Sequence, residues 1–111
     1  MGTPQYAIPV LDKLVDCGHD IAAVYTQPDR PAGRGRKLTS APVKIHSTDL
    51  GLQTVEIQKM SDRDSSVEYL LSLEAEAAIV AAYGIILPSS VIDKFSLGII
   101  NLHPSLLPKF R

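Results

Sequence analysis

The chain has little of several features that mark whole classes of proteins. Its single cysteine, Cys17, cannot form an internal disulfide, and no cationic and apolar leader stands at its start. No apolar stretch reaches the roughly 20 residues that a membrane-spanning helix needs. These absences predict a cytoplasmic protein that does not enter a membrane.

An excess of charge of one sign is lacking too. The net charge of -1 argues against a wholly basic nucleic-acid binder, although it allows a local basic patch. His and Cys residues do not cluster with the spacing of metal ligands, so no metal site is predicted. With 111 residues, 45% hydrophobic and 21% charged, the composition is that of one folded domain.

Short apolar runs alternate with helical patterns along the chain. Strands are expected at residues 21–26, 53–56, 77–82 and 98–101, and helices at residues 3–17, 43–50, 64–73 and 88–95. This alternation predicts an α/β fold, an open and mostly parallel Rossmann-like sheet with helices on both faces. A helix capped by Thr3 normally follows a strand, so the sheet is expected to lack its first strand. Residues 27–42 have no periodicity and are expected to form a loop.

The end of the last expected strand carries the chain's most informative polar residues. Asn101 and His103 are one residue apart, and side chains of extended chain alternate, so both are expected on one side. Such a pair suits acyl or formyl transfer, in which the amide donates to the oxyanion and the imidazole handles the proton of the attacking amine. The alternative is that Asn101 caps a turn and His103 is an ordinary surface residue.

The segment after the preceding apolar strand, residues 83–88, has two interpretations. In one, it is a hydrophobic loop that closes the core. In the other, it is a wall for a flat heterocycle: Gly84 allows close approach of the backbone, exposed main-chain groups pair with the ring edge, and apolar side chains cover its faces. Ligands of parallel sheets bind beyond the carboxyl ends of the strands, so this loop and Asn101 are expected to open on one edge.

The loop at residues 27–37 gathers four of the 11 basic residues of the chain. These are Arg30, Arg34, Arg36 and Lys37. A solvated linker is the ordinary explanation of a charge run, but a near-neutral protein that concentrates its cations in this way is expected to meet phosphates there. The segment lacks the Gly-x-Gly-x-x-Gly pattern of dinucleotide-binding proteins, so that class is excluded.

Four segments together closely resemble the methionyl-tRNA formyltransferase family, in the family's order. They are residues 1–4, 25–35, 82–88 and 101–108. The run Asn-x-His-Pro-Ser-Leu-Leu-Pro is also similar to that of the wider group of formyltetrahydrofolate enzymes, which includes glycinamide ribonucleotide formyltransferases. The Pro-Asp-Arg-Pro-Ala-Gly-Arg-Gly loop narrows the resemblance to the one family.

The resemblance implies transfer of a formyl group from 10-formyltetrahydrofolate to the amino group of initiator methionyl-tRNA, a step of translation initiation. It implies that Asn101 and His103 are the catalytic pair. The implied folate-binding residues are Ser105, Leu106, Leu107, Pro108, Tyr83, Gly84, Ile85, Ile86 and Leu87. The implied tRNA-binding residues are Arg30, Arg34, Arg36 and Lys37.

The family also has parts that this sequence does not show. These are a strand before Gly2, a catalytic Asp downstream of Pro108 and a C-terminal β-rich domain that grips tRNA. Residues 1–111 are therefore expected to be part of a formyltransferase N-terminal domain, inactive alone and monomeric when complete. Two alternatives stay open: a formyltetrahydrofolate-dependent transferase or hydrolase that acts on a small molecule, and a non-catalytic RNA-binding module.

Overall fold

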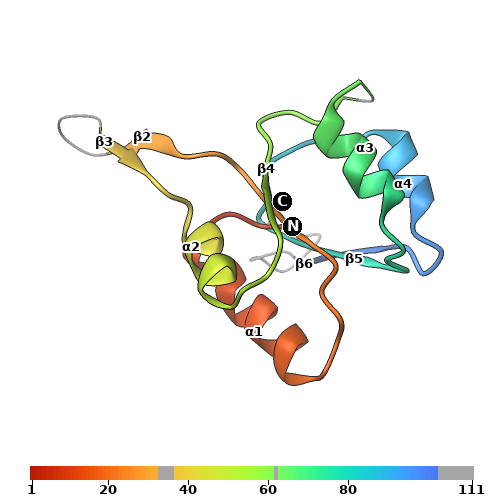
Figure 1. Ribbon diagram of the computed structural model, residues 1–111, viewed down its shortest axis with the longest axis horizontal. Helices are drawn as coiled ribbons and strands as arrows, with labels where there is room; N and C mark the ends of the chain where they lie inside the picture. The colour runs from red at the N-terminus through yellow and green to blue at the C-terminus, as the bar shows by residue number, and fades with distance from the viewer. Residues whose placement is uncertain (33–36, 62, 103–111) are drawn as a thin grey trace, which may run out of the picture.

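A computed structural model of the chain describes residues 1–32, 37–61 and 63–102. The helices are η1 (Gln5–Ala7, a 3-10 turn), α1 (Ile8–Asp16), α2 (Pro42–Asp49), α3 (Ser65–Ser72) and α4 (Ser89–Lys94). The strands are β1 (Val24–Thr26), β2 (Arg30–Ala32), β3 (Lys37–Thr39), β4 (Thr54–Glu56), β5 (Ala78–Ala81) and β6 (Ile99–Leu102). Outside residues 27–42, each element lies where the sequence predicts it, with ends that differ by a few residues (Figure 1).

The strands of the sheet run parallel, as predicted. β1 pairs with β4, and β5 pairs with β6 in a register that sets Val80 opposite Asn101. The two pairs are joined through the first residues of the chain. Gly2 bridges Ala81 in parallel and donates its N–H to the carbonyl of Tyr25 at 3.0 Å. Met1 and Gly2 thus lie between β1 and β5, where the sequence leads one to expect the strand that precedes Gly2.

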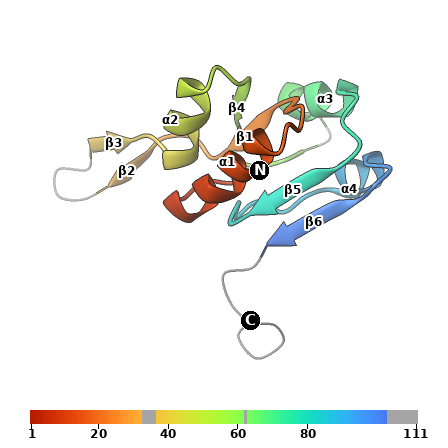
Figure 2. The ribbon, with the colours of Figure 1, turned by 90° about the horizontal axis from the view of Figure 1, so that it is seen from below.

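Helices cover both faces of the sheet, which confirms the predicted architecture. α1 and α2 lie on one side of the strands and α3 and α4 on the other (Figures 1 and 2). On the first side, Leu11, Val24, Val43 and Ala81 belong to one buried cluster. The larger cluster on the second side consists of Tyr25, Ile57, Met60, Val67, Leu70, Val80, Tyr83, Val91 and Phe95. Strands that are buried on both faces account for the continuous apolar runs of the sequence.

Local chemistry sets the helix ends. Asp64 accepts a hydrogen bond from the N–H of Ser66 at 2.8 Å and caps α3. Gly18 follows α1 with a φ of 80°, the left-handed conformation in which glycine commonly ends a helix. The prediction that Thr3 caps the first helix is wrong. η1 has Pro4 at its N-cap without a side-chain bond, and the hydroxyl of Thr3 turns instead toward Tyr83.

The prediction of a loop over residues 27–42 is also wrong. β2 and β3 pair antiparallel, with Arg30 opposite Thr39 and Ala32 opposite Lys37, and α2 begins at Pro42. The hairpin points away from the parallel strands (Figure 1). Its strands are three residues long, too short to show alternation in a segment rich in proline, glycine and arginine.

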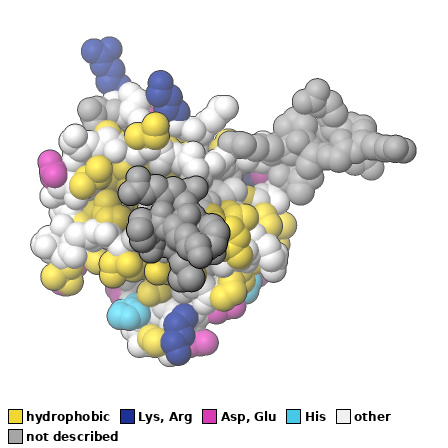
Figure 3. Space-filling view, turned by 180° about the vertical axis from the view of Figure 1, so that it is seen from behind, with side chains coloured by type: hydrophobic (Ala, Val, Ile, Leu, Met, Phe, Trp, Pro, Cys, Tyr) yellow, Lys and Arg dark blue, Asp and Glu magenta, His cyan; other side chains and the backbone are white. Residues whose placement is uncertain are grey.

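One face of the molecule shows several groups of hydrophobic side chains (Figure 3). In β6, the apolar side chains of Ile100 and Leu102 are 54% and 42% exposed. In the described ranges, no helix has the length and hydropathy needed to span a membrane.

Candidate functional site at the carboxyl edge of the sheet

The carboxyl ends of the strands meet at one edge of the sheet. Ala81 and Leu102, the last residues of β5 and β6, are register partners, and the strands run side by side (Figure 2). The loop after β5 therefore opens at the edge where β6 ends. Gln27 directly follows β1 and therefore lies at this edge. Thr3 lies beside it, since the N–H of Gln27 donates to the hydroxyl of Thr3 at 3.4 Å.

Asn101 lies in β6 one residue before the strand ends, and its side chain is exposed. By strand alternation it shares a face with Ile99, which packs against the cluster beneath α3 and α4. Its amide is free of the core and open to a ligand at this edge. The other member of the predicted pair, His103, lies outside the described residues, as do Ser105, Leu106, Leu107 and Pro108.

The loop after β5 combines a buried anchor with an exposed tip. Tyr83 is 1% exposed, whereas Ile86 is 90% exposed and Gly84 is also open to solvent. Ile85 and Leu87 are half-buried and pack against the core. Among the described residues, no backbone hydrogen bond uses the N–H groups of residues 84–87. Free amides beside an exposed apolar side chain fit the edge and the face of a flat heterocycle.

A polar network that the sequence analysis did not identify holds this loop. The side-chain amide of Gln27 donates to the carbonyl of Tyr83 at 2.6 Å in a buried setting. The hydroxyl of Thr3 lies 3.4 Å from the same carbonyl. A polar residue directly after a fully buried strand is a signal that could have pointed to Gln27, since such a side chain faces the binding edge.

The basic hairpin is attached to the fold by an ion-pair network. Lys44 of α2 lies 3.0 Å from Asp29, just before β2, and 2.8 Å from Glu56 of β4. Hydrogen bonding to Lys44 lowers the pKa of the Asp29 carboxyl, and hydrogen bonding to Glu56 and Asp29 raises the pKa of Lys44. The base of the hairpin is thus fixed to the helix and strand beside it.

The cations of the hairpin are placed only in part. Arg30 is the first residue of β2 and Lys37 is the first residue of β3. Arg34 and Arg36 belong to residues 33–36, outside the described ranges. The structure thus places the backbone of two of the four predicted phosphate-binding residues on one hairpin.

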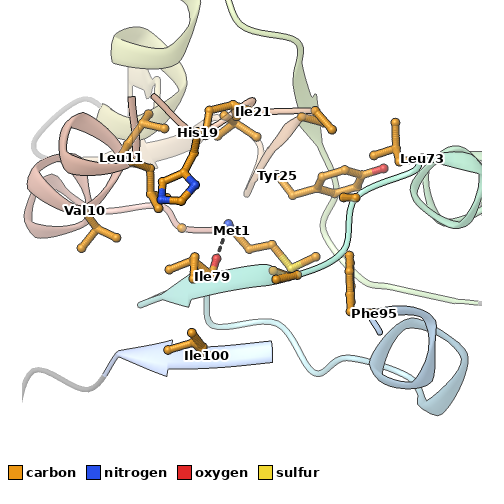
Figure 4. Close-up of a pocket in the computed structure, with 18 of the residues that line it drawn as sticks. Met1, Val10, Leu11, His19, Ile21, Tyr25, Leu73, Ile79, Phe95 and Ile100 are labelled. Carbon is orange, nitrogen blue, oxygen red and sulfur yellow. Dashed lines mark hydrogen bonds between the residues drawn. The ribbon is translucent and has the colours of Figure 1, made fainter. Parts of the chain in front are cut away.

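The larger cavity does not lie at the carboxyl edge. It has a volume of about 910 Å³ and separates β1 from β5 ahead of Met1, whose amino group donates to the carbonyl of Ile79 at 2.8 Å (Figure 4). Val10 and Leu11 line one side and Leu73 and Phe95 the other. Burial lowers the pKa of the Met1 amino group to about 6. This space lies away from the edge at which Asn101 and the loop after β5 meet, so we assign no ligand to it.

A second, shallow groove of about 390 Å³ lies between α1 and the exposed face of β6, with Pro9, Val10, Ile100 and Leu102 among its lining residues. It offers little polar chemistry. Among the described residues there is no group of three or more His, Cys, Asp or Glu side chains that could hold a metal ion.

A parallel α/β sheet with helices on both faces defines the Rossmann-like class of domain. Comparison with known sequences gives the particular family. The chain belongs to the family described as "Formyl transferase", because the sequence pattern of that family matches residues 1–111.

Curated relatives match over the whole chain. The methionyl-tRNA formyltransferase of Solibacter usitatus is 46% identical over 111 residues, which are 100% of this chain and 35% of the relative. The enzyme of the same name from Lysinibacillus sphaericus is 48% identical over 111 residues, 100% of this chain and 35% of the relative. That from Chromohalobacter salexigens is 48% identical over 110 residues, 99% of this chain and 34% of the relative. The chain thus spans about a third of the length of these relatives.

Proposed function

We propose that the chain provides the donor-binding and catalytic edge of a methionyl-tRNA formyltransferase. The reaction transfers the formyl group of 10-formyltetrahydrofolate to the amino group of methionine on initiator tRNA. The observation that carries the proposal is the match, over the whole chain, to enzymes of that name at 46% to 48% identity. Initiator tRNA is used in the cytoplasm, which is where we place the protein.

The chemistry needs a hydrogen-bond donor and a proton acceptor at one edge. The methionine nitrogen attacks the formyl carbon, a C–N bond forms, and the carbonyl oxygen becomes negatively charged. The exposed amide of Asn101 donates to that oxygen, and His103 takes the proton that the nitrogen loses. The bond to the folate nitrogen then breaks, and this nitrogen takes up a proton as tetrahydrofolate leaves.

The loop after β5 supplies the folate-binding wall in this proposal. The free N–H groups of residues 84–87 pair with the edge of the pterin ring, and Ile86, which is 90% exposed, covers its face. Ser105, Leu106, Leu107 and Pro108 close the other side, as the resemblance implies. A flat ring bound in this way sits beside Asn101, because β5 and β6 end together.

The basic hairpin is the tRNA-binding element. It projects from the sheet, and Asp29, Lys44 and Glu56 hold its base (Figure 1). Arg30, Arg34, Arg36 and Lys37 neutralise phosphates at the acceptor end. An enzyme that acts on a small amine or on water has no use for such a hairpin, so the hairpin favours tRNA as the acceptor over that alternative.

A chimeric enzyme tests the activity. Residues 1–111 replace the matching segment of the Lysinibacillus sphaericus enzyme, and formylation of methionyl-tRNA is measured with 10-formyltetrahydrofolate. We expect formylation at a rate near that of the parent enzyme. A folded chimera that binds folate but formylates only a small amine would favour the first alternative, and one that binds tRNA but no folate would favour the RNA-binding module.

The salt dependence of tRNA binding tests the hairpin. Replacing Arg34 and Arg36 with Gln in the chimera should weaken tRNA binding. The plot of the logarithm of the association constant against the logarithm of the salt concentration should become less steep, by roughly 1.4 to 1.8 in slope. The matched control replaces Lys13 and Lys59, two exposed cations outside the hairpin, and should leave the slope unchanged. Equal slopes for the two variants would contradict the assignment of the hairpin.

A further inference from the structure

The carbonyl of Tyr83 is the point at which the proposed folate loop is attached to the fold. It accepts hydrogen bonds from the side-chain amide of Gln27 at 2.6 Å and from the hydroxyl of Thr3 at 3.4 Å. The hydroxyl of Thr3 accepts in turn from the backbone N–H of Gln27 at 3.4 Å. Gln27 therefore contacts the carbonyl both directly and through Thr3.

The backbone around this carbonyl is unusual enough to need such support. Ala82 has a φ of 52°, in the left-handed region that side chains disfavour, and Gly84 has a φ of 76°. Two reversals of this kind on either side of Tyr83 send the chain sharply out of β5. A buried carbonyl without a partner costs about 1 to 3 kcal/mol, so the Gln27 bond stabilises this path over others.

The contact with Gln27 is also close in space. A Cβ atom on Gly84 would lie 2.7 Å from the amide nitrogen of Gln27. The loop backbone thus passes directly over the Gln27 side chain, which is 8% exposed. The position of the Gln27 amide therefore sets the direction in which the N–H groups of residues 84–87 point.

We propose that Gln27 is the positioning residue of the donor-binding loop: it fixes the Tyr83 carbonyl and so aims the amides of residues 84–87 at the folate. The inference rests on the proposed function, because it is the proposed ligand that gives the orientation of these amides its use. Gln27 acts through its hydrogen bond to the loop backbone, so its effect on binding in this proposal is indirect. Gln27 also stands three residues before β2. The same residue thus lies close in sequence to the base of the hairpin and contacts the proposed folate-binding loop after β5.

Backbone order parameters from ¹⁵N relaxation and folate titration of the 111-residue chain test this role. Gln27→Met keeps the length of the side chain and removes the hydrogen-bond donor. We expect the order parameters of residues 84–87 to fall and the Kd for tetrahydrofolate to rise roughly tenfold, while the order parameters of Val67 and Leu70 in α3 stay as in the parent. The matched control, Gln58→Met, changes an exposed glutamine and should alter neither readout.

A second variant distinguishes a role as hydrogen-bond donor from a merely structural role of Gln27. In Gln27→Glu the carboxylate cannot donate, whereas the protonated acid has one O–H donor. We expect its Kd for tetrahydrofolate to fall toward the parent value between pH 8 and pH 5, relative to the parent measured at each pH. A constant ratio of the two Kd values across this range would count against the donor role.

The outcomes separate this inference from the proposed function. If the parent chain binds no tetrahydrofolate, the folate assignment fails, and the order parameters of residues 84–87 in Gln27→Met alone decide whether Gln27 positions the loop. If Gln27→Met leaves both the order parameters and the Kd at parent values, or lowers the order parameters of the loop and of α3 equally, Gln27 is not a positioning residue.

Discussion

At the scale of single residues, Gly84 and Gly51 form a natural pair for comparison. Both have positive φ angles, 76° and 75°, so alanine is strained at either position. A Cβ added at Gly84 would lie 2.7 Å from the amide nitrogen of Gln27, whereas no atom of the described residues would lie within 4 Å of a Cβ added at Gly51. The difference between the two positions isolates the contact from the backbone strain.

We therefore expect Gly51→Ala to lower the free energy of unfolding by about 1 kcal/mol and Gly84→Ala by about 1 kcal/mol more. The added Cβ at Gly84 pushes the Gln27 amide away from the Tyr83 carbonyl, so folate binding should weaken only in this variant. Urea denaturation and folate titration of both variants provide the measurement. Equal losses of stability and equal affinities would show that the Gln27 contact has no energetic role.

Residues of the site differ in how far they could be foreseen. The place of Asn101 in the fold was predictable because it stands at the end of an apolar run, and it depends on local alternation that the sequence displays. The hydrogen bond of Gln27 was not predictable, because its partner, Tyr83, is 56 residues away and meets it only once β1 and β5 are assembled around Gly2. Thr3 was assigned to the wrong role for the same reason, since a helix cap and a tertiary hydrogen bond use the same hydroxyl.

At the scale of elements, α3 gives a direct test of local sequence chemistry. Asp64 was predicted to begin this helix, and its carboxylate accepts from the N–H of Ser66 at 2.8 Å. We expect Asp64→Ala to lower the free energy of unfolding by about 1 kcal/mol. Asp93→Ala, on the exposed side of α4, should have little effect and serves as the control. Thermal or urea unfolding of both proteins gives the comparison, and an unchanged midpoint for Asp64→Ala would contradict the cap.

The parallel strands and their helices were predictable, and the hairpin was not. The α-helices carry apolar patterns over six to nine residues, and β1 and β5 lie within apolar runs that the sequence displays without tertiary information. β2 and β3 are three residues each, contain Pro31, and are recognisable only through their pairing with one another. Tertiary pairing of so short a segment overrides its weak local preference.

At the scale of the whole molecule, the tyrosines of the larger core cluster link the two halves of the sheet. Tyr25 in β1 donates to the carbonyl of Ser66 in α3 at 2.6 Å, and Tyr83 follows β5. Burial is the main cause that raises the pKa of Tyr25 to about 12, and burial raises the pKa of Tyr83 as well. Both phenols are therefore held in their neutral form by the fold.

This predicts a loss of stability in alkaline solution. A tyrosine side chain in the unfolded chain ionises at roughly pH 10. Above that pH the unfolded chain loses protons that the folded chain keeps, so stability falls as pH rises toward about 12. Urea midpoints between pH 9 and pH 11 measure the decline, which should be shallower in Tyr25→Phe and unchanged in Tyr6→Phe, at an exposed tyrosine. Identical declines in all three proteins would contradict the account.

The central claim is that the amide of Asn101, at the edge where β5 and β6 end, stabilises the negative charge formed during formyl transfer. The most direct measurement is kcat for formylation of methionyl-tRNA by the chimeric enzyme with Asn101→Ala, beside Gln53→Ala as an exposed amide elsewhere. The account predicts a kcat lowered about 100-fold to 1,000-fold by Asn101→Ala, with little change in KM, and an unchanged kcat for Gln53→Ala. A folded Asn101→Ala enzyme that keeps the parent kcat would contradict it.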